Sequence, residues 1–166
     1  MEASSFSQSF PPLIGKEARV LILGSLPGKE SLRKQEYYAH PRNAFWPILF
    51  QLFAGQFSTA YQARVDFAKS QHVALWDVCQ SAIRPGSLDA NISKVSANDI
   101  DGVLKNNPSI THVAFNGQKA AQLYDKYFER QAHLSYACLL STSPANASYS
   151  FEQKLANWGA FLKMPM

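Results

Sequence analysis

Residues Ala18–Gly28, ARVLILGSLPG, join a short apolar run to a turn rich in glycine and proline. The residues from Val20 to Leu23 are consecutive apolar side chains, and the run stops at Gly24. A short apolar run that ends at a turn is typical of a strand buried on both faces of a parallel sheet. This stretch therefore predicts an α/β fold whose first core strand covers residues 18–23.

The rest of the chain alternates predicted strands with predicted helices. Apolar runs indicate further strands at residues 72–76, 110–115 and 136–140. Apolar residues at helical spacing predict helices at residues 43–55, 58–70, 98–107, 118–131 and 151–163. We expect residues 80–96, which are polar, to form a loop, and residues 1–15 to form an extended N-terminal segment.

Helices between successive strands imply right-handed crossovers and a mainly parallel sheet that is covered on both faces. We therefore expect a single domain over residues 1–166, with three α/β/α layers around a mainly parallel four-stranded sheet. A hydrophobic fraction of 46% with 17% charged residues is ordinary for a globular protein of this length and excludes a disordered chain. The net charge of +4 favours an anionic partner.

Cys79 and Cys138 are the only cysteines, and neither belongs to a Cys-x-x-Cys pair. Both lie in apolar runs, so we expect buried free thiols in a reducing compartment, with no disulfide and no structural zinc. The N-terminus lacks the basic and apolar regions of a signal peptide, and no apolar run is long enough for a membrane span. We expect a cytoplasmic monomer that uses no metal and no cofactor.

The unusual polar residues of the chain follow the predicted strands. Ligands of open α/β sheets bind outside the carboxyl ends of the strands. These ends are residues 24–28, Asp77 and the residues after it, residues 116–117 and residues 141–147. The turn at 24–28 contains neither the Gly-x-Gly-x-x-Gly nor the P-loop pattern, so nucleotide binding has no support, and taken alone it is equally a bare structural turn.

Taken together, these segments resemble the uracil-DNA glycosylase superfamily, and most closely its hypoxanthine branch, which is related to the mismatch-specific G:T/U glycosylases. GSLPG at 24–28 is similar to the first motif, and YAHPRNAFW at 38–46 is similar to the (F/Y)-A-H-P-x-N-x-F-W stretch that follows it. Residues 76–91 resemble the middle strand end with its loop. FNG at 115–117 resembles a further strand end, and STSPANA at 141–147 takes the place of the second motif.

Two positions depart from the pattern of this superfamily. Leu26 stands where many members carry a catalytic Asn or Asp, and Ser141 stands near the place of the histidine that opens the second motif in the uracil branch. The resemblance to the hypoxanthine branch assigns the catalytic role to the Asn of the HPRN stretch, which is Asn43 here.

Cleavage of an N-glycosidic bond places negative charge on the departing base, and water then attacks the sugar. The carboxamide of Asn43 suits both steps, because its oxygen can orient water and its nitrogen can donate to the base. Asn43 also fits the N-cap of the helix predicted at residues 43–55, with Pro47 in the first turn and Gly55 after the end. Both interpretations of Asn43 stay open at this point.

The resemblance also implies which residues contact the flipped base and the DNA. Tyr38 takes the place of the stacking aromatic, with a core tyrosine as the alternative, and Asp77 either reads the base edge or is a paired structural carboxylate. The residues expected to contact the base are Ser25, Leu26, Tyr38, His40, Asp77 and Asn116. The residues expected to contact DNA are Gly28, Arg42, Ser143, Pro144, Ala145 and Asn146.

The loop at 141–147 is expected to hold phosphates and to place a small wedge, Ala145 or Asn146, in the gap left by the flipped base. Ser143 is alternatively the N-cap of the last helix. The basic residues that are candidates for phosphate contacts, each otherwise a solvated surface charge, are Lys29, Arg33, Lys34, Arg42, Arg84, Lys119 and Lys154.

These features predict a monofunctional glycosylase that removes a deaminated base, hypoxanthine ahead of uracil, from double-stranded and possibly from single-stranded DNA. No lysine is placed to form a Schiff base, so no lyase activity is expected. The first alternative is a DNA-binding relative that lost its chemistry when Leu26 replaced the polar residue. The second is an unrelated small-molecule α/β enzyme, for which the chain carries no cofactor fingerprint.

Overall fold

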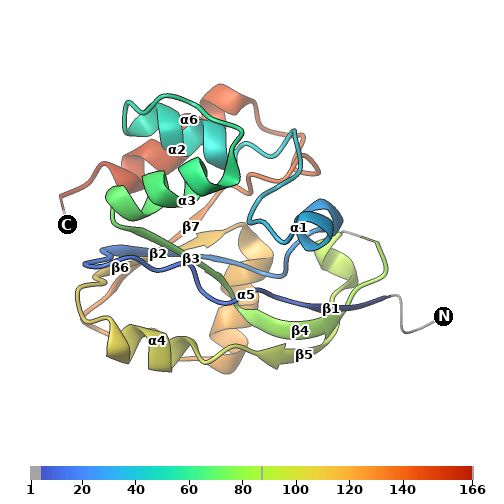
Figure 1. Cartoon of the computed structure of the whole chain (residues 1–166). Coiled ribbons are helices and arrows are strands. Elements are labelled where there is room, and N and C mark those ends of the chain that lie inside the picture. The colour runs from blue at the N-terminus through green and yellow to red at the C-terminus, as the bar shows by residue number, and fades with distance from the viewer. Residues whose placement is uncertain (1–4, 87, 166) are drawn as a thin grey trace.

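The computed structural model describes residues 5–86 and 88–165 and is built around a parallel sheet (Figure 1). Within these residues the sheet has four strands in the order β3-β2-β6-β7. They are β2 (Val20–Gly24), β3 (Val73–Asp77), β6 (His112–Asn116) and β7 (Ser135–Leu139). All three pairings are parallel. The predicted α/β fold and its four core strands are therefore confirmed.

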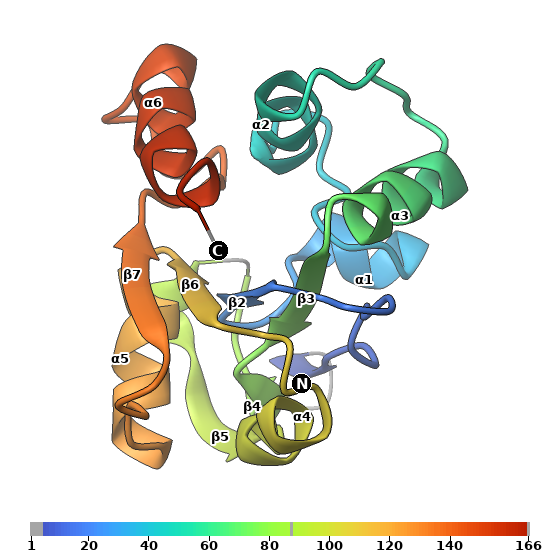
Figure 2. The ribbon, with the colours of Figure 1, turned by 90° about the vertical axis from the view of Figure 1, so that its left-hand side faces the viewer.

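Helices cover both faces of this sheet, so the predicted three layers are also confirmed (Figures 1 and 2). One face is covered by α2 (Phe45–Leu52), α3 (Tyr61–Ser70) and α6 (Phe151–Leu162), and the other by α4 (Ile100–Asn106) and α5 (Gln118–Tyr127). Strand β2 serves both layers, since Val20 and Ile22 belong to one buried cluster whereas Leu21 and Leu23 belong to the other. A strand buried on both faces explains the unbroken apolar run from which the fold was inferred.

The prediction of a loop at residues 80–96 is wrong. The segment contains strands β4 (Cys79–Ile83) and β5 (Ser93–Ala97) and the short helix η2 (Asp89–Asn91). With β1 (Phe6–Gln8) they form an antiparallel sheet in the order β1-β4-β5. These strands bury few side chains and expose small polar ones, so their composition resembles that of a loop. The register of the β4 and β5 pair also shifts twice, which weakens the alternating pattern.

The N-terminal segment is extended as expected, but it is also built into the fold, and residues 1–4 lie outside the described residues. After β1, Phe10 and Leu13 are buried in the core. The carbonyl of Phe10 accepts from the indole of Trp76 at 2.8 Å, and Leu13 forms a bridge with Leu75 of β3. This segment therefore ties the small sheet to the large one.

Several predicted helix ends differ from the structure. Helix α2 begins at Phe45 with Ala44 at its N-cap, instead of at Asn43, and it ends at Leu52 instead of Gly55. Helix α3 begins at Tyr61 and α5 ends at Tyr127, so both are shorter than predicted. A short helix, α1 (Lys29–Lys34), was not predicted. Packing and turn geometry, which apolar spacing does not report, decide these ends.

Two further predictions are corrected by the structure. The N-cap of α6 is Ser150 and not Ser143, because Ser150 and Gln153 form a reciprocal capping box. Cys79 is buried as expected, but Cys138 is exposed, since β7 lies at the edge of the sheet. Across residues 5–86 and 88–165, no helix has both the length and the apolar character that a membrane crossing needs.

Candidate active site

The parallel strands place their carboxyl ends along one edge of the large sheet, where the polar segments meet. Gly24 and Asp77 are register partners at the ends of β2 and β3. Asn116 ends β6, and the loop at 141–147 follows β7. The sheet order therefore brings together four segments that are far apart in the sequence.

Asn116 connects the end of β6 to the loop after β7. Its Oδ1 accepts from the backbone N–H of Thr142 at 2.9 Å, and its Nδ2 donates to the Thr142 hydroxyl at 2.9 Å. Thr142 is buried, so this amide pair is shielded from water. Both polar atoms of the Asn116 amide are thus engaged within the protein, and their partner Thr142, which lies inside the second motif, was not predicted from the sequence.

Asn43 lies one residue before the N-cap of α2 and is half-buried. Its Oδ1 accepts from the backbone N–H of Phe45 at 2.9 Å. The N–H of Ala44, between these two residues, donates to the Thr142 carbonyl at 3.0 Å. Only the amide oxygen can accept from an N–H, so the bond from Phe45 fixes the orientation of the carboxamide. Its Nδ2 donates to no other described residue and is free to meet a ligand.

Tyr38 is held in an unusual backbone conformation, with a φ of 53° in the left-handed region. One face of its ring packs on Phe45, with ring centroids 4.3 Å apart. Its hydroxyl is buried and finds no hydrogen-bond partner among the described residues. Burial, followed by the nearby Asp77 carboxylate, raises the pKa of this hydroxyl, whereas Asn116 lowers it.

Asp77 is 3% exposed, and its Oδ2 has no hydrogen-bond partner within residues 5–86 and 88–165. Burial raises the pKa of this carboxyl to about 7, with Asp89 adding to the shift and Arg84 opposing it. A Cβ atom at Gly24 would lie 2.5 Å from Asp77 Oδ1 and 3.4 Å from the Tyr38 hydroxyl. The absence of a side chain at Gly24 therefore lets these two polar groups approach each other.

The first-motif loop, residues Ser25–Gly28, carries its polar contacts through Ser25 and its backbone. The Ser25 hydroxyl donates to Asp89 Oδ1 at 2.8 Å. The Leu26 side chain is 6% exposed and packs in a core cluster, so the expected contact of Leu26 with the base stays a prediction that would involve its backbone. Arg84 donates to the carbonyl groups of Leu26 and Pro27. The side chain of Arg84 is 2% exposed, so it is not a surface charge.

The second-motif loop is a compact set of turns. Ser143 Oγ accepts from the N–H of Ala145 at 3.2 Å, and Asn146 Nδ2 donates to the Ser141 carbonyl at 3.1 Å. Ala145 is exposed, whereas Pro144 beside it is half-buried. Lys154 is buried and donates to the Ser143 carbonyl at 3.4 Å, so it supports this loop from within and is not a surface charge.

The remaining predicted residues lie beside these loops. Arg42 is exposed, and its backbone N–H donates to His40 Nδ1 at 3.0 Å, which leaves Nε2 of His40 for another partner. Within the part of the chain that the structure describes, no three His, Cys, Asp or Glu side chains are grouped so that they could hold a metal ion. From the sequence, Arg84 was expected only as a candidate phosphate contact and Asp89 had no assigned role, although the Arg-Pro-Gly turn at 84–86 lies in the segment that resembles a loop of the superfamily.

At one edge of the parallel sheet, a Gly-x-x-Pro-Gly loop follows β2 and a loop with serine and proline follows β7. The chain belongs to the uracil DNA glycosylase superfamily, whose family model matches residues 11–162. Two similar curated proteins are named hypoxanthine DNA glycosylase. The one from Methanosarcina barkeri (strain Fusaro) is 34% identical over 157 residues, which cover 94% of this chain and 98% of that protein. The one from Methanosarcina acetivorans is 32% identical over the same extent.

A solved structure agrees with this assignment. The solution NMR structure of a candidate uracil DNA glycosylase from Methanosarcina acetivorans has a TM-score of 0.84 and 32% sequence identity to this chain. The match covers 95% of this chain and 97% of that protein. The fold and the family predicted from the sequence are therefore confirmed.

Proposed function

We propose that this protein is a monofunctional DNA glycosylase that flips hypoxanthine out of double-stranded DNA and hydrolyses its N-glycosidic bond. The observation that carries the proposal is the fixed amide of Asn43, whose oxygen is held by the Phe45 N–H. Similarity to two hypoxanthine DNA glycosylases over nearly the whole chain supports hypoxanthine as the preferred base.

In the proposed reaction the glycosidic bond breaks first, and water adds to the sugar afterwards. Asn43 Nδ2 donates to the departing base as negative charge develops on it, while the second lone pair of Oδ1 is available to orient water. An amide is no strong general base, which fits this stepwise order. Asn43 is thus the proposed catalytic residue.

The proposed base pocket is lined by Ser25, Tyr38, His40, Asp77 and Asn116. Base binding requires stacking and hydrogen bonds to the base edge. The hydroxyl of Tyr38 and Oδ2 of Asp77 suit the second requirement, because both are buried without a partner in the described chain. With its pKa near 7, Asp77 is partly protonated at neutral pH, so it can donate to an acceptor on the base as well as accept.

The proposed DNA contacts come from exposed or half-buried residues beside this pocket, namely Gly28, Arg42, Ser143, Pro144, Ala145 and Asn146. Ala145 is the wedge that suits the space left by the base, because it is exposed and lies between Ser143 and Asn146, whose side chains are tied to the backbone. A small wedge predicts weak penetration of the duplex. We propose that the protein acts as a cytoplasmic monomer, and the two free thiols support a reducing compartment.

A second function is favoured by one observation. Leu26 packs in the core, so the first motif supplies no side-chain carboxylate or amide to the reaction. A superfamily member of this kind that binds DNA and cleaves weakly or not at all is the alternative.

Labelled duplexes that contain hypoxanthine, uracil, xanthine or a G·T pair separate these functions when abasic sites are cleaved with alkali. We expect scission of the hypoxanthine duplex, and a single-stranded hypoxanthine substrate tests whether pairing is needed. Retained binding with no scission of any substrate would favour the inactive alternative. Treatment without alkali should leave every strand intact, because no lyase step is expected.

A further inference from the structure

Arg84 is a buried arginine at the end of β4 that contacts the backbone of the first-motif loop. Its Nη1 donates to the Leu26 carbonyl at 3.4 Å and to Asp89 Oδ1 at the same distance, and its Nη2 donates to the Pro27 carbonyl. Asp89 Oδ1 also accepts from the Ser25 hydroxyl at 2.8 Å. Arg84 and Asp89 therefore hold the loop at three consecutive residues.

These contacts complete a row of carbonyl groups that all face the segment from β3 to β4. The Gly24 carbonyl accepts from the N–H of Val78 at 2.8 Å, and the Ser25 carbonyl accepts from the N–H of Cys79 at 3.0 Å. Arg84 takes the next two carbonyls, those of Leu26 and Pro27. The four successive carbonyl groups of residues 24–27 thus accept from Val78, Cys79 or Arg84.

The peptide bonds of the described residues are trans. In a trans peptide the N–H points opposite to the preceding carbonyl. The N–H groups of Ser25, Leu26 and Gly28 are therefore turned away from β4, and in the described chain none of them has a hydrogen-bond partner. With no partner inside the protein, these donors are available to water or to an acceptor on a ligand.

We propose that Arg84, supported by Asp89, is a positioning residue for base removal: it holds the Pro27 carbonyl toward β4 and thereby presents the N–H group of Gly28, which shares that peptide, to the DNA substrate. A role of this backbone donor in catalysis rests on the proposed function. The hydrogen bonds by which Arg84 fixes the first-motif loop do not depend on that function. A leucine in the first motif is compatible with activity on this basis, because the backbone and not the side chain supplies the donor.

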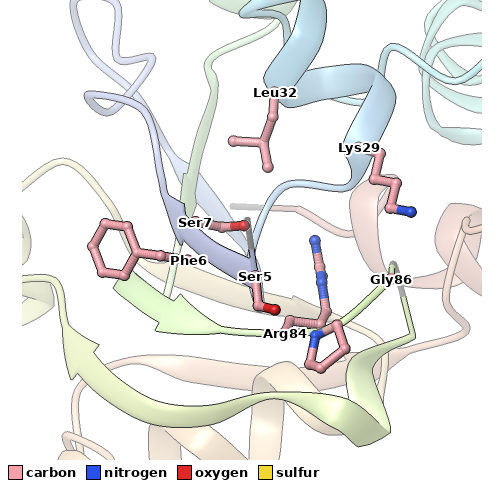
Figure 3. Close-up of a pocket in the computed structure, with 8 residues that line it drawn as sticks. Ser5, Phe6, Ser7, Lys29, Leu32, Arg84 and Gly86 are labelled. Carbon is pink, nitrogen blue, oxygen red and sulfur yellow. The ribbon is translucent and has the colours of Figure 1, made fainter. Parts of the chain in front are cut away.

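The surroundings of Arg84 make this proposal testable by chemical rescue. Arg84 lines an open cavity of about 480 Å³ together with Ser5, Ser7, Lys29, Leu32 and Gly86 (Figure 3). Figure 3 shows the Arg84 side chain extending between Ser5 and Ser7 on one side and Lys29 at the start of α1 on the other. Removal of this side chain leaves a space that is open to solvent, into which a free guanidinium ion can enter.

The experiment compares wild type, Arg84→Ala and the control Arg130→Ala, in which an exposed arginine paired with Asp125 is removed. Hydrogen exchange of residues 24–32 and 78–79, followed at the Leu32, Val78 and Cys79 N–H groups that donate to loop carbonyls, reports the loop, and single-turnover release of hypoxanthine reports the reaction. We expect Arg84→Ala to exchange faster in these segments and to release the base on the order of tenfold to a hundredfold more slowly, because a displaced donor is misaligned. Arg130→Ala should change neither quantity.

Guanidinium, at concentrations far below those that unfold proteins, should restore both quantities in Arg84→Ala, whereas sodium at equal ionic strength should not. Merely structural damage is not repaired in this way. Should Arg84→Ala fail to fold, Arg84→Lys and Asp89→Asn replace it. Arg84→Lys should lose part of the rate without guanidinium rescue, because the lysine occupies the space, and Asp89→Asn should lose less.

Unchanged loop exchange in the Arg84 variants would overturn the proposal, and so would a rate loss that guanidinium does not restore in folded Arg84→Ala. If wild type releases no base from any duplex, the proposed function fails. The exchange measurement still decides whether Arg84 holds the loop, so the two failures are distinguishable.

Discussion

The buried polar side chains of the candidate site differ in whether they have hydrogen-bond partners within the protein. The amide of Asn116 is paired with Thr142, whereas the Tyr38 hydroxyl and Asp77 Oδ2 have no partner in the described parts of the chain. A buried polar group without a partner costs about 1–3 kcal/mol. Such a cost is typical of sites where a ligand completes the bonds, so these two atoms support the proposed place for the base edge.

Asn43 has a proposed catalytic role, through its Nδ2 donor, and a structural role, through its Oδ1 acceptor, and substitutions can separate the two. Asn43→Ala should lower the single-turnover rate on the order of a hundredfold, through loss of the Nδ2 donor. It should also cost about 1 kcal/mol of stability, because the Phe45 N–H loses its acceptor. Asn43→Asp is the matched control, since it keeps that acceptor and removes the donor. It should remain as stable as wild type and be as slow as the alanine variant, and a fast Asp variant would contradict the role of the Nδ2 donor.

The burial of Asp77 predicts how stability depends on pH. Its pKa rises from 3.8 to about 7 on folding, so between these values the folded protein binds more protons than the unfolded chain. Stability from this group therefore falls as pH rises through that range, and the full cost is present above about pH 7. Asp77→Asn removes the charge, so relative to wild type it should be more stable at about pH 8 than at about pH 5. Urea unfolding at both values measures this, and an equal difference at the two would contradict the prediction.

At the scale of elements, two loops are fixed by side chains that reach them from neighbouring segments. Arg84 of the β4 end holds the first-motif loop, and Lys154 of α6 donates to the Ser143 carbonyl of the second-motif loop. Helix α6 is in turn anchored by Trp158, whose indole donates to the Leu140 carbonyl at 2.8 Å. The small antiparallel sheet and α6 thus support the site although neither supplies a predicted catalytic residue.

The two serines before α6 should respond differently to substitution. Ser150→Ala should lower the free energy of unfolding by about 1 kcal/mol, because it breaks the capping box with Gln153. At a temperature where the variant is folded, its rate of base release should equal that of wild type. Ser143→Ala should show the reverse pattern, with weaker DNA binding and a smaller loss of stability. Thermal unfolding and DNA titration of both variants provide the comparison, and a larger stability loss in Ser143→Ala would identify it as the true cap.

At the scale of the whole molecule, a net charge of +4 is modest for a protein that binds DNA. Two of the predicted phosphate contacts, Arg84 and Lys154, are buried and bind the protein's own carbonyl groups. Lys29, Arg33, Lys34 and Arg42 are exposed and lie in or near the loops after β2 and α1. We therefore expect few phosphate contacts and a moderate dependence of binding on salt.

Arg42 tests this expectation. Arg42→Gln should weaken binding to all duplexes alike and reduce the slope of log K against log salt by about one, because one phosphate contact is lost. Arg130→Gln is the control, since its charge is paired with Asp125, away from the proposed DNA contacts. Fluorescence anisotropy at several salt concentrations measures both slopes. Equal slopes for wild type and Arg42→Gln would exclude Arg42 as a phosphate contact.

Much of the architecture was readable from local patterns. A strand buried on both faces, such as Val20–Gly24, must be apolar at every position, so its sequence reveals it without knowledge of its neighbours. The strands β4 and β5 expose much of their surface, and their small polar residues look like a loop until a partner strand is known. Likewise, Cys138 lies in an apolar run but is exposed, because only the order of the strands places β7 at an edge.

The sequence by itself determined the α/β class, the four core strands and the glycosylase superfamily, because these depend on residue type and spacing along the chain. Only the tertiary structure decided that Leu26 turns into the core, that Asn116 is paired with Thr142, and that Arg84 and Asp89 hold the first-motif loop. Which polar group finds a buried partner depends on contacts between segments distant in sequence. Those contacts form only when the strands are placed side by side.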